Sequence, residues 1–299
     1  MSTSHQPISA LHTVGVRYRG SRPTQGDERS LDAYIAAAVY WEPGLPVVYS
    51  EPSMPEPKRG ENEPANLGHI CAAIAEAVAV GRAEGRAVLL TGGDCNHAVG
   101  VFAGLQRAHG PSARIGLIWF DAHGDFNTAH TTLSGMLGGM PVAVCAGLTH
   151  ANWRELAGVS APLPTDRLLF VDVRNLDEPE AQLLHATEAV VAAPAPGFPG
   201  VDLAEAVAEL AARCDLLYLH IDSDILDETL VPNHGTREPN GPDAAQIASA
   251  IETVMATGKV AAFAVVSVYG VGPGSEVSVP SGIELIRAGL ASWQRHGMA

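Results

Sequence analysis

The segment 117–128, LIWFDAHGDFNT, constrains this chain more than any other. Its apolar start predicts a short buried strand. Asp121, His123 and Asp125 follow, and in an extended chain alternate side chains point to one face. Carboxylates gathered at one spot repel each other unless a proton or a cation lies between them, and a divalent metal is a suitable cation. Taken alone, the same residues also suit a second interpretation, in which they cap the next helix and form turn hydrogen bonds.

A second apolar segment ends in the same way. Residues 216–221, LLYLHI, predict another buried strand, and Asp222 and Asp224 follow it, with His220 one step earlier on the same face. In an open parallel sheet, ligands bind beyond the carboxyl ends of the strands, so both groups of acids are expected to meet there. Helix capping explains two such strand ends poorly. Four carboxylates and a histidine are too many ligands for one magnesium-like ion, and they indicate a two-metal site.

The remaining chain alternates between predicted strands and predicted helices. The strands are expected at 14–18, 45–49, 87–90, 117–120, 167–173, 216–221 and 260–268. The helices are expected at 31–40, 65–85, 96–109, 132–148, 178–184, 203–213, 244–255 and 282–294. Such alternation is typical of a mostly parallel sheet covered on both faces, so we expect a three-layer α/β/α fold. No long linker divides the chain, and we expect one domain over residues 1–299.

Composition and charge exclude several classes of partner. The 299 residues carry a formal net charge of −15, which disfavours binding to nucleic acid and to anionic membranes. No apolar run reaches the roughly 18 residues of an ordinary membrane-spanning helix. Residues 1–9 lack the apolar core of a signal peptide. We therefore expect a cytoplasmic protein that acts on a small molecule. Four cysteines in a chain of this length predict no disulfide framework.

A third group of residues also follows an apolar strand. Gly92, Gly93, Asp94 and Cys95 come after the predicted strand at 87–90, and two glycines allow a tight turn and a close approach of the backbone to a neighbour. On its own this segment also suits a simple strand-to-helix turn capped by Asp94. Together the three segments GGDC, DAHGDFNT and HIDSDILDE resemble the ureohydrolase (arginase/agmatinase) family, and the resemblance covers most of the chain.

The resemblance implies an α/β/α fold, a homo-oligomer and a pair of manganese ions. In this family a bridging hydroxide attacks a guanidinium or similar carbon and expels an amine or urea. Oxygen ligands suit manganese, and two metal ions would lower the pKa of a bridging water. Asp125 or Asp222 is expected to hold the hydroxide proton and pass it to the leaving group. The positions that match the family's metal ligands are Cys95, Asp121, His123, Asp125, Asp222 and Asp224.

Cys95 departs from the family pattern, which has a histidine at this position. With a cysteine at this position the chain resembles the N-omega-hydroxy-arginine amidinohydrolases of antibiotic biosynthesis. The segment 134–140 resembles the same enzymes. A thiolate is softer than an imidazole, so zinc, cobalt or nickel become alternatives to manganese. His97, two residues on, is either an alternative ligand or a histidine on a helix surface.

The substrate-contacting positions of the family are retained in part. Gly138 stands where arginases have a histidine that shuttles a proton and holds the substrate. His130 and His234, in neighbouring loops, are either candidates for that role or surface histidines. The positions that match substrate-binding residues are Asn127 and Ser134 for an α-carboxylate, Asn175 for an α-amino group, and Thr236 in a substrate loop.

Ser267 departs furthest from the family pattern. A family glutamate that pairs with the guanidinium normally stands at this position, and serine cannot neutralise a buried cation. Either another carboxylate, such as Glu238 or Glu276, takes over, or the reacting group is not a full guanidinium. A hydroxyguanidino, amidine, formimino or amide group then becomes an alternative.

Two other classes of function remain open at this point. The changes at Cys95, Gly138 and Ser267 also suit a ureohydrolase-like subunit that has lost activity and regulates a partner. The Asp-x-His motif and the missing glutamate also permit a metal-dependent deacylase that cleaves an amide. Metal content distinguishes an inactive subunit from an enzyme. The products released distinguish a deacylase from a ureohydrolase.

Overall fold

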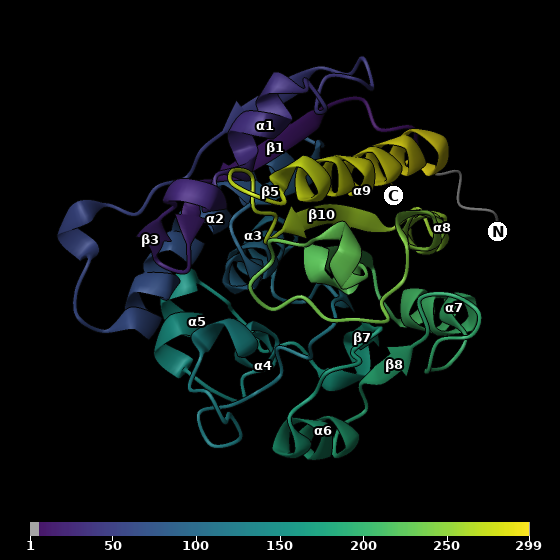
Figure 1. Ribbon diagram of the computed structural model, residues 1–299. Coiled ribbons are helices and arrows are strands. Elements are labelled where there is room, and N and C mark those ends of the chain that lie inside the picture. Colours follow the sequence, from purple (N-terminus) through teal and green to yellow (C-terminus); the bar gives the residue numbers. More distant parts are fainter. Residues whose placement is uncertain (1–5, 299) are drawn as a thin grey trace.

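An eight-stranded sheet forms the centre of the molecule (Figure 1). The structure is a computed structural model, and it describes residues 6–298 except for the side chains of residues 27 and 57. Every pairing in this sheet is parallel, and the strand order is β4-β1-β5-β10-β9-β6-β7-β8. The predicted mostly parallel sheet is therefore confirmed. The strands are β1 (Leu11–Val16), β4 (Val47–Ser50), β5 (Ala87–Gly92), β6 (Ile115–Phe120), β7 (Leu168–Val171), β8 (Val190–Ala192), β9 (Leu216–Asp222) and β10 (Val260–Val266), with a separate antiparallel pair of β2 (Tyr18–Arg19) and β3 (Arg22–Pro23).

Helices cover both faces of the sheet, so the α/β/α layering is confirmed as well (Figure 1). Alternate residues of β6 show how the layers form. Leu117 and Trp119 point into one apolar core, and Ile118 and Phe120 point into the other. The first core is shared with α2 (Glu63–Ala83), α3 (Ala98–His109), α4 (Pro141–Cys145), α5 (Ala151–Ala157) and α6 (Glu178–His185). The second is shared with α1 (Ser30–Ala36), α7 (Leu203–Arg213), α8 (Ala244–Met255) and α9 (Ser275–His296).

The four middle strands bring the chemically distinctive segments to one edge. β5, β10, β9 and β6 are neighbours, and the register pairs Phe120 with Ile221 and Val266 with Asp222. The chain that follows each strand therefore leaves the sheet at the same carboxyl edge. At the end of β5, Gly92 has a φ of 71°, and a Cβ there would lie 2.7 Å from the Val16 carbonyl oxygen. Only glycine fits this turn without displacing its neighbour.

The prediction of a helix at 132–148 is wrong. The segment forms a turn at Gly135 with a φ of 72°, a short 3-10 helix at Leu137–Gly139, and then α4 over Pro141–Cys145. The Thr132 hydroxyl accepts a hydrogen bond from the Gly135 backbone N–H, a local bond that competes with helix formation. Four glycines and Pro141 further disfavour a continuous helix here.

Other boundaries differ from expectation by smaller amounts. The strand expected at 260–268 ends at Val266, because Ser267 adopts a left-handed φ of 62° that breaks the extended chain. α9 begins at Ser275, seven residues before the expected start, and includes Pro280. β8 and α5 were not expected, since both are short and lack a clear apolar period.

α2 is long and apolar enough to cross a membrane by length and composition alone. Core helices of globular proteins meet the same criteria. In its most apolar 18-residue window 56% of α2 is buried, and the helix packs against α3 and α5. Its apolar side chains are therefore accounted for by packing inside the fold.

Candidate metal centre

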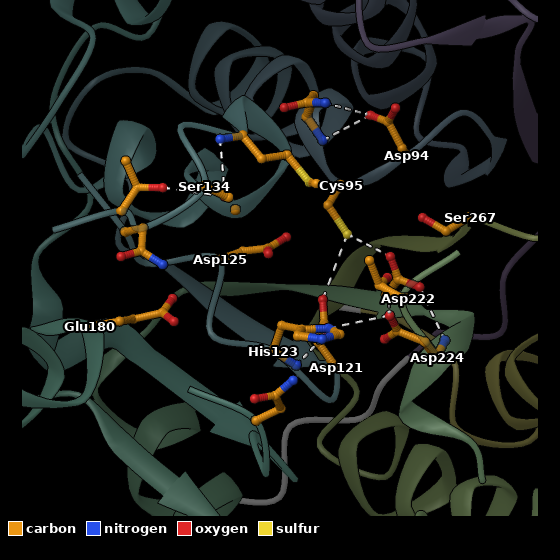
Figure 2. A pocket seen from close by; sticks show the side chains of 18 of the residues that line it. Asp94, Cys95, Asp121, His123, Asp125, Ser134, Glu180, Asp222, Asp224 and Ser267 are labelled. Atoms are coloured by element: carbon orange, nitrogen blue, oxygen red, sulfur yellow. Dashed lines mark hydrogen bonds and ion pairs between the residues drawn. The ribbon is translucent and has the colours of Figure 1, made fainter. Parts of the chain in front are cut away.

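A pocket lies at the carboxyl edge of the sheet, where the segments after β5, β6, β9 and β10 meet (Figure 2). The structure thus brings together side chains that are far apart in the sequence, such as Cys95 and Ser267, which are 172 residues apart. The lining includes twelve of the thirteen site residues expected from the sequence: Cys95, Asp121, His123, Asp125, Asn127, Ser134, Asn175, Asp222, Asp224, His234, Thr236 and Ser267.

Three overlapping groups of side chains in this pocket are close enough to hold metal ions. In each group the ligand atoms lie within 4.8 Å of one another. Asp121, Asp222 and Asp224 each belong to two groups, so a pair of ions would share them as bridging or neighbouring ligands. The groups are Cys95 with Asp121 and Asp222, Asp121 with His123 and Asp224, and Asp222 with Asp224 and His234.

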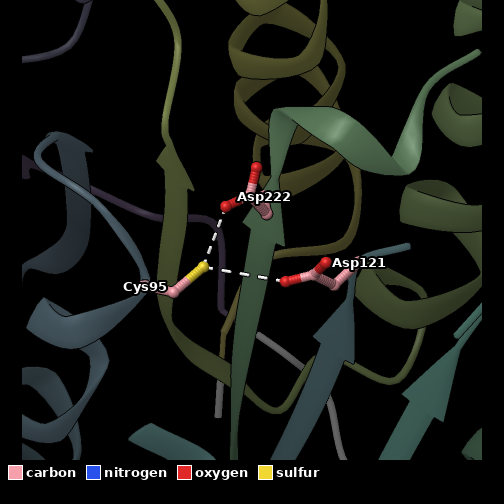
Figure 3. A group of neighbouring side chains, drawn as sticks. All are labelled: Cys95, Asp121 and Asp222. Atoms are coloured by element: carbon pink, nitrogen blue, oxygen red, sulfur yellow. Dashed lines mark hydrogen bonds between the residues drawn. The ribbon is translucent and has the colours of Figure 1, made fainter. Parts of the chain in front are cut away.

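The first group joins three segments of the chain (Figure 3). Cys95 comes from the turn after β5, Asp121 from the end of β6 and Asp222 from the last position of β9. The Cys95 Sγ lies 2.9 Å from the Asp222 Oδ2 and 3.7 Å from the Asp121 Oδ2. Burial, and then the charges of the nearby carboxylates, raise the pKa of the Cys95 thiol well above its ordinary value. The sulfur is therefore a thiol until a cation offsets those charges.

His123 connects the second group to the pocket wall. Its Nδ1 lies 3.3 Å from the Asp121 Oδ1 and 3.2 Å from the Asp224 Oδ2. Burial would lower the pKa of His123, but hydrogen bonding to these two carboxylates, and their charge, outweigh it and raise the pKa to about 12. In the absence of metal a proton on the imidazole thus holds the place that a cation would take.

Electrostatics in the centre favour a bound cation. Burial, followed by the charge of neighbouring carboxylates, raises the pKa of Asp121 and of Asp125 well above the ordinary value for aspartate. Burial acts in the same direction on Asp222, but the nearby imidazole of His234 outweighs it and holds the pKa of Asp222 below its ordinary value. The Asp224 Oδ1 and the His234 Nε2 are buried and form no hydrogen bond within residues 6–298. Such orphaned polar atoms and crowded oxygens fit divalent metal ions.

Asp125 lies in the pocket but outside the three ligand groups. Its φ of 46° is unusual for a residue with a side chain. The Asp125 carbonyl accepts a hydrogen bond from the Val142 backbone N–H at the start of α4, which helps to hold this conformation. Strained backbone of this kind is frequent at functional sites, where it aims a side chain that regular structure would point elsewhere.

His234 comes from the loop after β9 and completes the third group. Its Nε2 lies 3.3 Å from the Asp222 Oδ1. Its Nδ1 accepts a hydrogen bond from the Thr236 backbone N–H, so the proton of the neutral ring is on Nε2 and faces the acids. The Thr236 hydroxyl donates to the Asp224 Oδ2 at 2.9 Å, which links this loop to the carboxylates.

The residues expected to bind substrate line the same pocket. The Asn127 amide donates to the Asp177 carboxylate, and the Asn175 amide donates to Glu238 at 2.6 Å. Ser134 is exposed at the rim, where its hydroxyl accepts from the Met136 backbone N–H. These polar groups therefore share one pocket with the metal ligands.

Several other candidates are not brought into the pocket. His130 is exposed and is not part of the lining. His97 is fully buried, which excludes the helix-surface interpretation, and its ring is bonded to the backbone of Asp94 and Gly20 rather than to the acids. Glu276 accepts a hydrogen bond from the Gly274 N–H at the start of α9. Glu238 lies 3.5 Å from the His123 Nε2, away from Ser267.

Glu180 and Arg19 are among the lining residues that were not predicted from the sequence. Glu180, in the first turn of α6, is buried, and its carboxylate accepts the Phe126 backbone N–H at 2.8 Å. Burial raises its pKa. Arg19 ends β2 with its side chain 28% exposed, its Nε 3.7 Å from the Asp94 Oδ2 and its guanidinium 5.1 Å from the ring centre of Tyr269. Acidic helix starts and arginines in loops are common at surfaces, so neither residue carried a signal.

Comparison with known proteins relates the chain to one family. A family profile described as "Arginase family" matches residues 39–276. An arginase of Bacillus caldovelox is 33% identical over 192 residues, which are 60% of this chain and 61% of that protein. An arginase of Bacillus subtilis (strain 168) is 31% identical over 154 residues, which are 50% of each. The chain thus spans about half to three fifths of the length of these curated relatives.

Solved structures show the same fold. A structure titled as arginase from Bacillus cereus has a TM-score of 0.81 at 24% identity, with 94% of this chain and 98% of that chain covered. Formimidoylglutamase from Bacillus subtilis subsp. subtilis str. 168 has a TM-score of 0.71 at 13% identity, with 97% and 88% covered. At these identities the likeness is one of fold.

Proposed function

This chain belongs to the arginase family, and we propose that it is a metal-dependent hydrolase that cleaves a C–N bond of a small guanidino, hydroxyguanidino or amidine-type molecule. The observation that carries the proposal is the set of three overlapping ligand groups in one pocket. A subunit without catalytic function would have no reason to retain that many buried carboxylates, because their mutual repulsion destabilises the fold. The family match and the retained acids together favour an enzyme.

Two divalent ions would be held by Cys95, Asp121, His123, Asp222 and Asp224, with Asp125 closing the pocket beside them. When bound, such ions supply a water of lowered pKa and stabilise charge that develops on the substrate. Carboxylate and imidazole ligands suit manganese, whereas the Cys95 sulfur also admits zinc, cobalt or nickel.

We assign the transfer of the proton to Asp222 and His234. The His234 Nε2 carries the ring proton and faces the Asp222 carboxylate at 3.3 Å. Asp222, the carboxylate with a lowered pKa, remains ionised and accepts the proton of the attacking water. His234 then delivers its Nε2 proton to the departing amine as it receives the proton that Asp222 took from the water, so the ring stays neutral. It takes over the role that Gly138 leaves vacant, whereas His130 lies outside the pocket.

The reacting group is proposed to be less basic than the guanidinium of arginine. Ser267 supplies no negative charge, and Arg19 adds a positive charge to the same pocket, since arginine stays protonated at every working pH. Arg19 is partly balanced by Asp94, whose Oδ2 lies 3.7 Å from the Arg19 Nε. A cationic substrate group would meet like charge there, whereas a neutral group with an oxygen would find a hydrogen-bond donor.

The opposite end of the substrate is proposed to be that of an amino acid. Asn127 and Ser134 offer amide and hydroxyl donors for a carboxylate, and Asn175 and Thr236 line the same pocket. Glu180 adds a buried carboxylate that suits an ammonium group. Residues at this end fix the distance between the substrate head and the metal ions, and so select chain length.

Metal content and product analysis test this proposal. The protein is stripped, reloaded with manganese or cobalt, and assayed for release of urea, hydroxyurea, ammonia and carboxylate. We expect metal-dependent release of urea or a substituted urea, or of ammonia or an amide from an amidine. Asp224→Asn is expected to lose metal and activity. Asp227→Asn, in the same segment but outside the pocket lining, is the matched control and is expected to keep both. Full activity in stripped protein refutes the proposal.

Three further expectations stay predictions: one domain over residues 1–299, a homo-oligomer and a cytoplasmic location. The oligomeric state is read directly from light scattering on the purified protein. Cooperative unfolding in a single calorimetric transition is the expected signature of one domain.

A further inference from the structure

Two aromatic rings lie behind the metal ligands and are not used in the proposed reaction. Trp119 on β6 and His220 on β9 are register partners and are fully buried. Their rings stack at a centroid distance of 3.9 Å and an interplanar angle of 8°. The Trp119 Nε1–H donates to the Asp121 Oδ2 at 3.2 Å, and the His220 Nε2 lies 3.3 Å from the Cys95 Sγ. Each ring therefore meets one ligand of the group formed by Cys95, Asp121 and Asp222.

The direction of the bond between His220 and Cys95 follows from the chemistry of a sulfur ligand. A cysteine that binds a metal must be a thiolate, which has no proton to donate. A contact of 3.3 Å then requires the hydrogen to be on the His220 Nε2. The Nδ1 of the same ring is left as an acceptor, and the Tyr218 hydroxyl, 2.7 Å away, is its donor. The three side chains form one directed chain, from the tyrosine O–H through the imidazole to the sulfur.

We propose that His220, oriented by Tyr218 and held flat by Trp119, is a positioning residue that donates an N–H···S hydrogen bond to the Cys95 ligand. The inference rests on the proposed metal-dependent function. Donation to the sulfur withdraws electron density from it, so the thiolate becomes a weaker and less soft ligand. Hydrogen bonds from neighbouring groups orient metal ligands and tune their donor strength in this way. A cysteine in place of the family histidine thereby remains compatible with metals that prefer oxygen and nitrogen.

Cobalt(II) gives a direct readout of this bond, because a thiolate ligand to cobalt produces a sulfur-to-metal charge-transfer band in the near ultraviolet. The probe is the cobalt-loaded protein, and Cys95→Ser identifies the band by abolishing it. His220→Phe keeps a buried ring but removes the donor. We expect its band to move to lower energy, because the sulfur is a stronger donor without the N–H, and its cobalt affinity to fall by about 10- to 100-fold, because the sulfur is no longer oriented as a ligand. His220→Gln, which can place an amide N–H near the same position, is expected to recover most of both.

Two further variants keep the test decisive. Tyr218→Phe removes only the donor to Nδ1, and we expect a smaller shift in the same direction. His12→Phe changes another buried histidine of the sheet, bonded to Ser50 on β4, and is expected to leave the band unchanged. An unshifted band in both His220→Phe and Tyr218→Phe overturns the inference, and so does an equal shift in the phenylalanine and glutamine variants of His220. Cobalt bound without a sulfur band overturns it too, whereas a wild-type protein that binds no cobalt refutes the proposed function itself.

Discussion

Removing the metal should reverse the way in which stability depends on pH. The metal-free centre compensates its crowded carboxylates with protons, because the pKa of His123 is raised to about 12 and that of Asp121 is raised well above the ordinary value. In the unfolded chain His123 titrates near 6.5. The folded metal-free protein therefore holds a proton above pH 6.5 that the unfolded chain has lost. A raised pKa of this kind contributes stability that is fully present below pH 6.5 and is lost as the pH rises toward 12.

The size of the effect follows from linkage. For each proton held only in the folded state, the free energy of unfolding falls by roughly 1–2 kcal/mol for every unit by which the pH rises. We choose the interval from pH 7 to 8, because buried histidines with lowered pKa, such as His220 and His12, are neutral there in both states. The lowered pKa of Asp222 contributes stability that is present above the unfolded pKa, and it adds no slope in this interval. A domain of this size should lose roughly 3 °C in Tm for one such proton.

Metal loading should change the sign of that slope. Metal binding requires deprotonated ligands, so affinity rises with pH, and a ligand that binds only the folded state stabilises it in proportion to the logarithm of its saturation. The assay is calorimetry or thermal unfolding at pH 7.0, 7.5 and 8.0, in chelator and in excess manganese or cobalt. We expect Tm to fall with pH in chelator and to rise or stay level with metal. Parallel slopes in the two series would show that His123 and Asp121 do not hold the compensating protons.

Three further predictions concern single side chains. Asp121→Ala and Asp222→Ala are expected to lose bound metal in elemental analysis, and full metal content in both would contradict the ligand assignment. Cys95→His should keep the fold and shift the ratio of manganese to cobalt affinity toward manganese by about tenfold or more; an unchanged ratio would mean that the sulfur is not a ligand. Arg19→Met should lower kcat/KM for a neutral, oxygen-bearing substrate and raise it for a cationic guanidine, since two like charges about 6 Å apart cost roughly 3 kcal/mol at an effective dielectric of 20. Arg22→Met, whose guanidinium pairs with Glu28 outside the pocket, is the control, and equal changes in the two arginine variants would count against a role for Arg19.

The parts of the site that were predictable from sequence are those that follow a strand. Asp121 and Asp222 come directly at the ends of apolar runs, and alternation along an extended chain already places their neighbours on one face. Parallel packing then forces the two ends to the same edge of the sheet. Periodicity and strand ends were therefore enough to predict the layers and the meeting of the acids.

The remaining parts depend on contacts that no local pattern encodes. His234 reaches Asp222 from a loop, and Arg19 reaches Asp94 from a distant part of the sequence. Glu180 resembles any acidic residue at a helix start, and only the fold turns it toward Phe126. The failure at 132–148 has a similar cause, since apolar residues suggested a helix while glycines and a threonine-capped turn decided the backbone. Loop residues are selected by tertiary contacts rather than by period.

The most direct test of the central claim is the substrate preference of the metal-loaded protein. Steady-state kinetics are measured on one cobalt- or manganese-loaded preparation with L-arginine, agmatine, N-hydroxy-L-arginine and a formimino amino acid. Ser267 and Arg19 leave a cationic group without a counter-charge, so we expect the less basic hydroxyguanidino or formimino compound to show a kcat/KM at least tenfold above that of L-arginine. The highest kcat/KM for L-arginine would contradict this claim.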